Sequence, residues 1–291
     1  MSTAFIDKRK PFTLQSYVER DITMLITSRD NLKVKEIRKL TGRKERDRTR
    51  AFFIEGTCMV TQAIEAGADI ELLIACPELL DDQSRSIIDQ LSGIPCLDVS
   101  AKVFETIAQF NNSQGISAVV RQRWEQLENV RLSDELCWIA INSVQCPSNL
   151  GALLRISDAV GGRGVILIGN SADPYYPASV RSSLGAIFSQ RLVRTDFPEF
   201  AQWKQQHGYY IVGTSPAGSV DYQSAAYNPP LVLLLGNEWA GLTEEQESLC
   251  DVLVRIPMMG RIESHDVTVA AGIVLYEILN QQRRKFDTDA H

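Results

Sequence analysis

Several features that mark other protein classes are missing from this chain. Its 291 residues include six cysteines, but none forms a CxxC pair or stands with a histidine at zinc-finger spacing. We therefore expect no metal site, and free thiols that act as small hydrophobic side chains in a reducing compartment. The cysteines are Cys58, Cys76, Cys96, Cys137, Cys146 and Cys250.

Long apolar segments are also absent. No run reaches the roughly 18 residues that a membrane span needs. Residues 1–21 carry charges where a signal peptide requires a continuous apolar stretch. With 44% hydrophobic and 23% charged residues, the composition is that of a soluble globular protein. We expect a cytoplasmic protein without a membrane partner, and an organellar address stays open.

Common nucleotide and zinc signatures are lacking as well. The sequence contains neither a Walker A loop nor an HExxH motif. Gly161, Gly162 and Gly164 follow an expected helix, whereas the glycines of a dinucleotide fingerprint stand between a strand and a helix. This difference argues against a nucleotide-dependent oxidoreductase, the competing interpretation for an α/β chain.

The charge is distributed unevenly. A net charge of −6 alone argues against a nucleic-acid partner, yet residues 29–50 hold ten basic and four acidic residues, giving +6 there and −12 elsewhere. A compact basic patch suits phosphate contacts, although a solvated helix face would give the same pattern. The residues that we expect to bind RNA are Arg29, Lys33, Lys35, Lys39, Arg43, Lys44 and Arg46.

Hydrophobic periodicity predicts two α/β domains, residues 1–130 and residues 131–291. In the first, Val34, Ile37 and Leu40 form the apolar stripe of a helix that ends at Gly42, and residues 43–50 follow as an exposed charged loop. In the second, apolar runs alternate with helical patterns and so indicate a parallel sheet covered by helices on both faces. These runs are LCWIAI, GVILIG, RLVRT, YYIVGT, LVLLLG and VLVRIP.

The first chemically informative segment is INSVQCPSNLGALLRISDAVGG, a strand followed by a turn and a helix that opens near Asn149. Arg155 lies one turn after Gly151, and we expect the missing side chain to leave space beneath the guanidinium. With free backbone amides near Asn149, such a helix start suits a phosphate or a developing oxyanion. An ordinary surface arginine and an ordinary helix cap remain the alternative.

Two further segments end strands in loops. In LVLLLGNEWAGLT a buried strand stops at Gly236, where ligands of parallel sheets gather, and Glu238 can accept hydrogen bonds. In VLVRIPMMGRIESHDVTVAAGIVLYEIL a loop leads to a helix that starts after Ser264 or Asp266. The small residues around Gly272 would suit close packing against a second subunit. The alternatives are a tight turn and simple helix capping.

Together these segments resemble the three signature motifs of SpoU-type 2′-O-ribose RNA methyltransferases of the SPOUT class. N-x-G-x-x-x-R is present at Asn149, Gly151 and Arg155, G-N-E-x-x-G at residues 236–241, and the third motif as IPMMGRIESHDVTVAAGI. ADPYYPASVRSSLGAIF is similar to the helix that links them. NLKVKEIRKL and FFIEG resemble, less specifically, the family's ribosomal-protein-like substrate-binding domain.

The resemblance implies a parallel-sheet domain with a deep trefoil knot, a smaller N-terminal α/β domain and a homodimer. It also implies methyl transfer from S-adenosylmethionine to a ribose 2′-hydroxyl, with ribosomal RNA the first expectation and transfer RNA the second. A non-catalytic RNA-binding relative stays open. The implied catalytic residues are Asn149, Arg155, Glu238, Ser264 and Asp266, and the implied cofactor-binding residues are Thr214, Ser215, Leu235, Gly236, Asn237, Glu238, Ile256, Met258 and Val267.

Two positions depart from the family pattern. Members usually have Ser-Leu-Asn where this chain has Ser264, His265 and Asp266, and they often have an acidic residue at the position of Cys146. An ionised aspartate caps a helix but donates no hydrogen bond. His265 is then either a base or an ordinary loop residue. For Arg155, whose guanidinium stays protonated, we expect a role in orienting the ribose and stabilising an alkoxide rather than a role as base.

Overall fold

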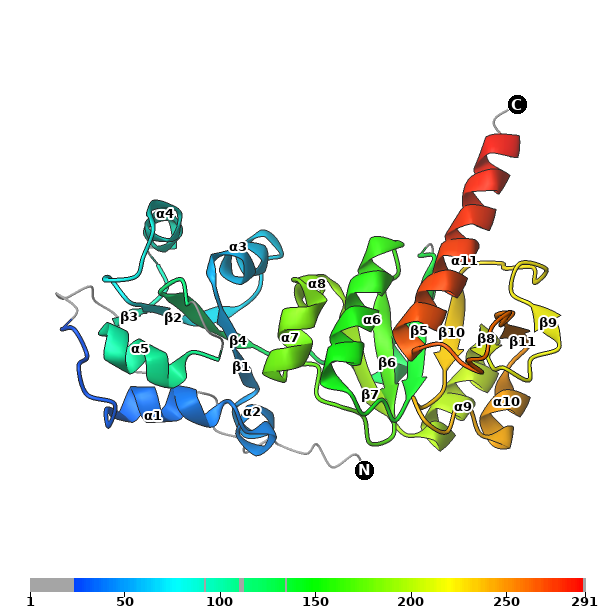
Figure 1. The fold of residues 1–291 in the computed structure, drawn as a ribbon, viewed down its shortest axis with the longest axis horizontal. Coiled ribbons are helices and arrows are strands. Elements are labelled where there is room, and N and C mark those ends of the chain that lie inside the picture. Colours follow the sequence, from blue (N-terminus) through cyan, green and yellow to red (C-terminus); the bar gives the residue numbers. More distant parts are fainter. Residues whose placement is uncertain (1–23, 92, 110–112, 134, 290–291) are drawn as a thin grey trace, which may run out of the picture. The chain divides into compact units, whose positions relative to one another are not determined.

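The computed structural model describes residues 24–91, 93–109, 113–133 and 135–289 (Figure 1). The chain forms two compact units that divide after Gln122, and the short segment Tyr175–Pro177 groups with the first. Residues 1–21, whose charges argue against a signal peptide, lie outside the described residues.

The N-terminal unit is built on a four-stranded sheet with strand order β1-β4-β2-β3. Strand β4 (Ile116–Arg121) lies antiparallel to β1 (Ala51–Glu55) and to β2 (Ile70–Ala75), and β3 (Cys96–Asp98) runs parallel to β2. The helices are α1 (Leu32–Lys39), α2 (Arg43–Thr49), α3 (Thr57–Glu65), α4 (Asp82–Gln90) and α5 (Ala101–Ile107).

The apolar stripe of α1 is buried as its spacing predicts. Val34, Ile37 and Leu40 are each at most 2% exposed, and they pack in one cluster with Phe53 of β1 and Val103 of α5. The helix begins after Asn31, whose side chain accepts a hydrogen bond from the backbone of Lys33 at 2.9 Å. The small α/β domain predicted from the sequence is therefore present.

The expectation of an exposed loop after Gly42 was wrong. Residues 43–49 form α2, and Arg46 on this helix is only 1% exposed. Its Nη1 donates to the carbonyl oxygens of Leu40 and Thr41, both at 2.7 Å. The last carbonyls of a helix lack intrahelical partners, and the buried guanidinium supplies donors for them. Arg46 is thus a structural residue, and the expectation that it binds RNA was wrong.

The C-terminal unit contains a seven-stranded sheet in which every pairing is parallel. The strand order is β7-β6-β5-β10-β8-β11-β9. The strands are β5 (Cys137–Asn142), β6 (Gly164–Ile168), β7 (Arg191–Thr195), β8 (Tyr210–Thr214), β9 (Val220–Asp221), β10 (Leu231–Leu235) and β11 (Val252–Arg255). The six apolar runs identified in the sequence are the six longer strands.

Helices cover both faces of this sheet, as the continuous apolar strands predict. On one face Phe200 and Trp203 pack against alternate side chains of β5, β6, β7, β8 and β10. On the other, the sheet contacts two helices that also pack on each other. The helices are α6 (Pro147–Ala159), α7 (Pro177–Ser183), α8 (Ala186–Ser189), α9 (Phe197–His207), α10 (Glu244–Leu249) and α11 (Val267–Asp289), of which α9 covers the first face and α6 and α11 the second (Figure 1).

Gly272 on α11 serves packing within the chain. A Cβ atom at this position would lie 2.7 Å from Cδ1 of Ile156 on α6, so the glycine lets the two helices meet. The neighbouring residues Ala271, Val274 and Ile278 are fully buried. The close approach attributed to a second subunit is therefore made by α6, and the homodimer stays a prediction on other grounds.

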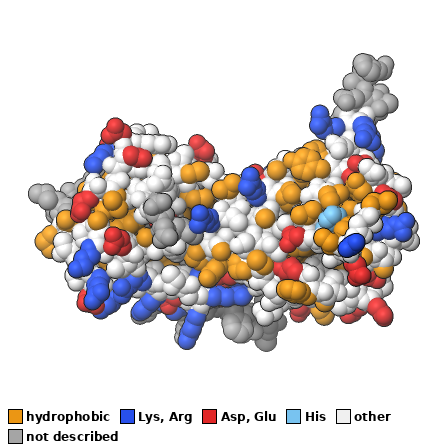
Figure 2. All heavy atoms as spheres, in the orientation of Figure 1, with side chains coloured by type: hydrophobic (Ala, Val, Ile, Leu, Met, Phe, Trp, Pro, Cys, Tyr) orange, Lys and Arg blue, Asp and Glu red, His pale blue; other side chains and the backbone are white. Residues whose placement is uncertain are grey.

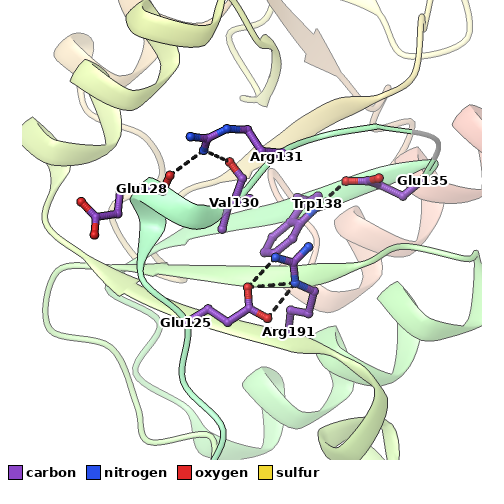
Figure 3. Close-up of polar contacts among 7 residues, drawn as sticks. All are labelled: Glu125, Glu128, Val130, Arg131, Glu135, Trp138 and Arg191. Atoms are coloured by element: carbon purple, nitrogen blue, oxygen red, sulfur yellow. Dashed lines mark hydrogen bonds and ion pairs between the residues drawn. The ribbon is translucent and has the colours of Figure 1, made fainter.

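The second unit begins with a segment that extends its sheet. The backbone N–H of Glu125 donates to the carbonyl oxygen of Leu192 at 2.8 Å, beside the outermost strand β7. The Glu125 carboxylate accepts two hydrogen bonds from Arg191 Nε and one from its Nη2, at 2.5–2.9 Å. The Arg191 guanidinium lies over the ring of Trp138, and Trp138 Nε1 donates to Glu135 (Figure 3). Residues 123–130 thus pack with the second unit.

Neither a membrane span nor a metal cluster is found in the described part of the chain. No helix there is long and apolar enough to cross a membrane. No group of three or more His, Cys, Asp or Glu side chains is arranged to hold a metal ion among those residues.

We predict that Arg46→Ala destabilises the N-terminal unit by about 2–6 kcal/mol, because two carbonyl oxygens lose their buried donor at about 1–3 kcal/mol each. Hydrogen exchange of the β1 amides in the full chain, measured against urea, reports this free energy. Lys44→Ala on the same helix is the control, and as an exposed change it should cost no more than about 0.5 kcal/mol. Equal stability of the two variants would contradict the structural role.

Candidate active site

The site lies where neighbouring parallel strands end. Strands β5, β10, β8 and β11 are adjacent in the sheet, so the loops that follow them meet at one edge. These loops contain the three sequence motifs, which lie far apart along the chain. The fold therefore brings together segments that the sequence could relate only by their order.

Glu238, in the loop after β10, makes the main link between these loops. Its carboxylate accepts hydrogen bonds from the backbone N–H groups of Gln145, at 3.0 and 3.1 Å, and of Cys146, at 3.1 Å. Cys146 is the N-cap residue of α6 and provides no side-chain cap of its own. A carboxylate at this position satisfies free donors and complements the positive end of the helix dipole.

This contact bears on one expectation. The sequence predicts that backbone amides near Asn149 are free for a phosphate or an oxyanion. The amides of Gln145 and Cys146, just ahead of α6, are occupied by the carboxylate of Glu238, which arrives from the distant loop after β10. An anion-binding role for the amides nearer Asn149 stays a prediction.

The loop that carries Glu238 is a closed turn. Asn237 and Gly241 exchange backbone hydrogen bonds at 3.0 and 2.9 Å, and the Asn237 side chain accepts from the backbone N–H groups of Trp239 and Ala240. Its Nδ2 also donates to the carbonyl oxygen of Ser143 at 2.8 Å. Gly241 has a φ of 67°, in the left-handed region that favours glycine. Asn237 therefore fixes the turn and fastens it to the loop after β5.

Asn149 lies between two carboxylates. Its Nδ2 is 3.5 Å from an oxygen of Glu238 and 3.5 Å from Oδ2 of Asp266. Asp266 also accepts at Oδ1 from the N–H of Thr268 at 2.8 Å and from its hydroxyl at 2.5 Å, as a residue capping α11 does. Both oxygens of Asp266 act as acceptors, so these contacts do not require the donor that asparagine would supply. One residue from each motif meets here.

Arg155 projects from α6 and is exposed. Its guanidinium has no hydrogen-bond or ion-pair partner within the described ranges, and so remains available to an incoming group. The space expected beneath it is not present at Gly151. A Cβ there would lie 2.0 Å from Oγ of Ser182 and 2.3 Å from the carbonyl oxygen of Ser179. The glycine makes room for α7, and that part of the prediction was wrong.

Ser264 and His265 lie in the loop between β11 and α11 and are exposed. Neither side chain forms a hydrogen bond with a described residue. The structure places them on the same loop as Asp266 but gives them no contact with Asn149 or Glu238. Their part in the site stays a prediction.

The residues expected to hold the cofactor follow three adjacent strands, β10, β8 and β11. Ser215 is buried; its N–H donates to the carbonyl oxygen of Val254 at 3.0 Å, which continues the pairing of β8 with β11, and its own carbonyl oxygen accepts from the N–H of Gly218 at 3.0 Å in the turn after β8. Leu235 is fully buried in β10, so only its backbone can face a ligand. Half-buried side chains beside strand ends suit a small organic molecule with apolar parts, as S-adenosylmethionine is. Thr214, Ile256 and Met258 are such residues at or just after these strand ends, and Val267 is the half-buried first residue of α11.

Sequence reasoning missed Gln145. Its side chain donates to the carbonyl oxygens of Ser143 at 2.8 Å and Asn170 at 3.1 Å, while its backbone serves Glu238. Ser143 adopts a φ of 51°, an unusual conformation for a residue other than glycine. The only signal was the position of both residues between a strand end and the first motif, which is too general to single them out.

The basic residues expected to bind RNA lie on or beside α1 and α2, where Figure 2 shows lysine and arginine side chains gathered. Lys33 and Lys35 are half-buried and pair with Glu36 and Asp30 at 3.3 and 3.0 Å. A surface hollow of about 380 Å³ is lined by Leu32, Lys35, Glu36, Arg38 and Lys39. The other basic residues of the patch, Arg29, Lys39, Arg43 and Lys44, are exposed.

Comparison with protein families gives two matches. The model described as the SpoU rRNA methylase family matches residues 137–276, and that of an MRM3-like substrate-binding domain matches residues 31–118. The chain is similar to a 23S rRNA (guanosine(2553)-2′-O)-methyltransferase of Bacillus subtilis, with 31% identity over 87% of this chain and 98% of the relative. It is also 30% identical to a 23S rRNA (uridine(2479)-2′-O)-methyltransferase of Streptomyces viridochromogenes, over 88% and 92% of the two chains.

Solved structures share the same fold. An AdoMet-bound rRNA methyltransferase from Sinorhizobium meliloti superposes with a TM-score of 0.81 and 35% identity, covering 89% of this chain and 98% of that one. The SpoU methyltransferase AviRb of Streptomyces viridochromogenes in complex with AdoMet gives a TM-score of 0.79 at 28% identity, over 87% and 98%. The α/β fold class predicted from the sequence is thereby confirmed.

We predict that Glu238→Gln loosens the link between the two loops, because an amide cannot accept from both N–H groups with the strength of a carboxylate. Hydrogen bonds to a charged group contribute about 1.5–3 kcal/mol, so the Gln145 and Cys146 amides should exchange about 10- to 150-fold faster. Hydrogen exchange resolved by NMR measures this. Glu244→Gln, at an exposed position of α10, is the control. Unchanged protection of both amides in Glu238→Gln would refute the capping role.

Proposed function

Because this chain belongs to the SpoU rRNA methylase family, we propose that it transfers a methyl group from S-adenosylmethionine to a ribose 2′-hydroxyl of ribosomal RNA. The observation that carries the proposal is the meeting of Asn149, Glu238 and Asp266, one residue from each motif, at the carboxyl edge of a parallel sheet. Relatives named as 23S rRNA 2′-O-methyltransferases and a neighbour with bound AdoMet support the substrate and the cofactor.

The cofactor supplies a methyl group on a sulfonium, which is already a good leaving group, so positioning of the ribose dominates the work left to the protein. Glu238 and Asn149 hold the loop after β5 against the loop after β10. Ser264 and Asp266 close the site from the start of α11. The residues that bind the cofactor lie around the ends of β8, β10 and β11: Thr214, Ser215, Leu235, Gly236, Asn237, Glu238, Ile256, Met258 and Val267.

Arg155 acts on the nucleotide. Its exposed guanidinium, unpaired within the described part of the chain, can hold the ribose and the adjacent phosphate with its planar set of donors. The same donors stabilise negative charge that develops on the 2′-oxygen as its proton leaves. Arg155 thus orients the ribose and stabilises charge, and we do not assign it the role of base.

The N-terminal unit holds the RNA. Its basic patch offers phosphate contacts that do not depend on sequence. The match to a substrate-binding domain over residues 31–118 supports this division of labour. We assign RNA binding to the unit that ends at Gln122 and methyl transfer to the unit that begins at Arg123, rather than to parts that meet at residue 130. The residues that contact phosphates are the exposed Arg29, Lys39, Arg43 and Lys44 and the half-buried Lys33 and Lys35.

The active form is a homodimer, in which the trefoil knot of the family shapes the cofactor loops, and it acts in the cytoplasm. Exposed apolar side chains on α11 and on the loop before it support a surface that contacts the second subunit. These side chains are Met259, Ile262, Val269 and Tyr276. Sedimentation of the purified chain tests the dimer. A monomer that retains activity would refute it.

The decisive experiment maps 2′-O-methyl groups in total RNA from cells with and without the gene. We expect one nucleotide of large-subunit ribosomal RNA to lose its methyl group when the gene is deleted. Loss at a transfer RNA nucleotide instead would replace the substrate, and an unchanged map together with no calorimetric binding of S-adenosylmethionine would favour a non-catalytic RNA-binding relative.

We predict that Arg155→Lys lowers kcat for methylation about 10²- to 10³-fold, the usual cost of removing one positioned donor to a developing oxyanion, although the charge is kept. Calorimetry should show the same affinity for S-adenosylmethionine as in the unmodified chain. Arg163→Lys, an exposed position after α6, is the control. Full activity of Arg155→Lys would show that planar guanidinium geometry is not needed.

We predict that replacing Lys39 and Lys44 together with alanine weakens RNA binding at every sequence. The slope of log affinity against log salt should fall by about 2, because each lysine that neutralises a phosphate contributes about 1 to that slope. Filter binding of transcribed 23S ribosomal RNA between about 50 and 200 mM salt measures this. Lys102→Ala, an exposed lysine on α5, serves as the matched control. A slope equal to that of the control would indicate a solvated helix face.

A further inference from the structure

Trp239 is exposed to an unusual degree for its size. It is 90% accessible, although it lies in the closed turn after β10 directly beside Glu238. Its backbone N–H is held by the Asn237 side chain at 2.9 Å, while its ring makes no aromatic or cation contact with the described residues. At this exposure most of the ring surface is accessible to a molecule that binds at the site, and an aromatic ring is well suited to stacking on planar groups.

The turn presents the ring at a fixed place. Asn237 accepts hydrogen bonds from two successive N–H groups of the turn and is itself tied to Ser143, so the backbone under Trp239 is held on two sides. The carboxylate of Glu238 reaches the start of α6, where it lies 3.5 Å from Asn149. Within this turn, Glu238 therefore contacts the protein, while Trp239, the next residue, is exposed to solvent.

Trp239 is the one large aromatic side chain in the motif loops. Residues 143–149, 236–242 and 256–266, all of them described, contain a single Phe, Tyr or Trp between them, and it is Trp239. The nucleobase of the methylated nucleotide hangs from the carbon next to the reacting 2′-position, so it must lie close to any site that holds that ribose. A base taken out of its stack is commonly received on an aromatic ring.

We propose that Trp239 stacks on the nucleobase of the nucleotide whose ribose is methylated, or on the base next to it, and so positions the ribose beside Arg155 and Asn149. This inference rests on the proposed function. Stacking tolerates any base, so Trp239 contributes positioning and affinity rather than base identity. An RNA base is preferred over a second copy of the chain as the occupant because the ring belongs to the turn that carries Glu238.

The test compares Trp239→Ala, Trp239→Phe and Trp239→Leu in transfer of labelled methyl groups to transcribed 23S ribosomal RNA. Phenylalanine keeps a stacking face, whereas leucine keeps apolar contact without one. We expect kcat/KM for RNA to fall about 5- to 150-fold in the alanine and leucine variants and to stay within about threefold in the phenylalanine variant. Calorimetric affinity for S-adenosylmethionine and the sedimentation coefficient should not change in any of them.

A second readout follows the ring directly. Adding the same RNA should quench tryptophan fluorescence in the unmodified chain, and the quench should shrink in Trp239→Phe. The proposal is overturned if Trp239→Ala methylates RNA normally, if leucine serves as well as phenylalanine, or if Trp239→Ala alters the oligomeric state, which would place the ring at a subunit interface. If the unmodified chain methylates no RNA at all, the proposed function fails instead.

Discussion

The carboxylate of Glu238 at the start of α6 is the contact on which the arrangement of the site depends. It supplies the cap that Cys146 does not, and in doing so it joins the loop after β10 to the loop after β5. Asn149 lies in the first turn of α6 and is therefore set against both Glu238 and Asp266. Loosening this one contact would shift a helix that also carries Arg155.

Much of this molecule could be predicted from its sequence. The continuous apolar runs predicted the parallel strands, since a strand buried on both faces needs no alternation. Val34, Ile37 and Leu40 predicted one buried helix face in the N-terminal unit. The resemblance of the three motifs to one family's signature implied a shared site, and the structure places their loops at one edge of the sheet because the strands before them are neighbours.

What could not be predicted are contacts whose partners no local pattern names. In the sequence Arg46 is one more charge in a basic run, yet its guanidinium is buried and donates to the carbonyl oxygens at the end of α1. Gly151 suggests room for a ligand, yet α7 fills that room with Ser182. The amides of Gln145 and Cys146 bind a carboxylate, and no local pattern indicates that it belongs to Glu238. In each case the local pattern identified a residue that requires a partner but did not identify the partner, which comes from another segment of the chain.

The pairing of Glu125 with β7 has a practical consequence for anyone who isolates the methyltransferase domain. A strand at the border of a sheet exposes unpaired N–H and C=O groups that recruit strands from other molecules, and proteins shield such borders. Here Trp124 and Glu125 shield β7. Glu125 is held there by Arg191, and Trp124 by the Arg194 guanidinium that lies over its ring. A truncated chain that starts at residue 131 would leave β7 uncovered and prone to aggregate, whereas a chain that starts at residue 123 would keep β7 covered.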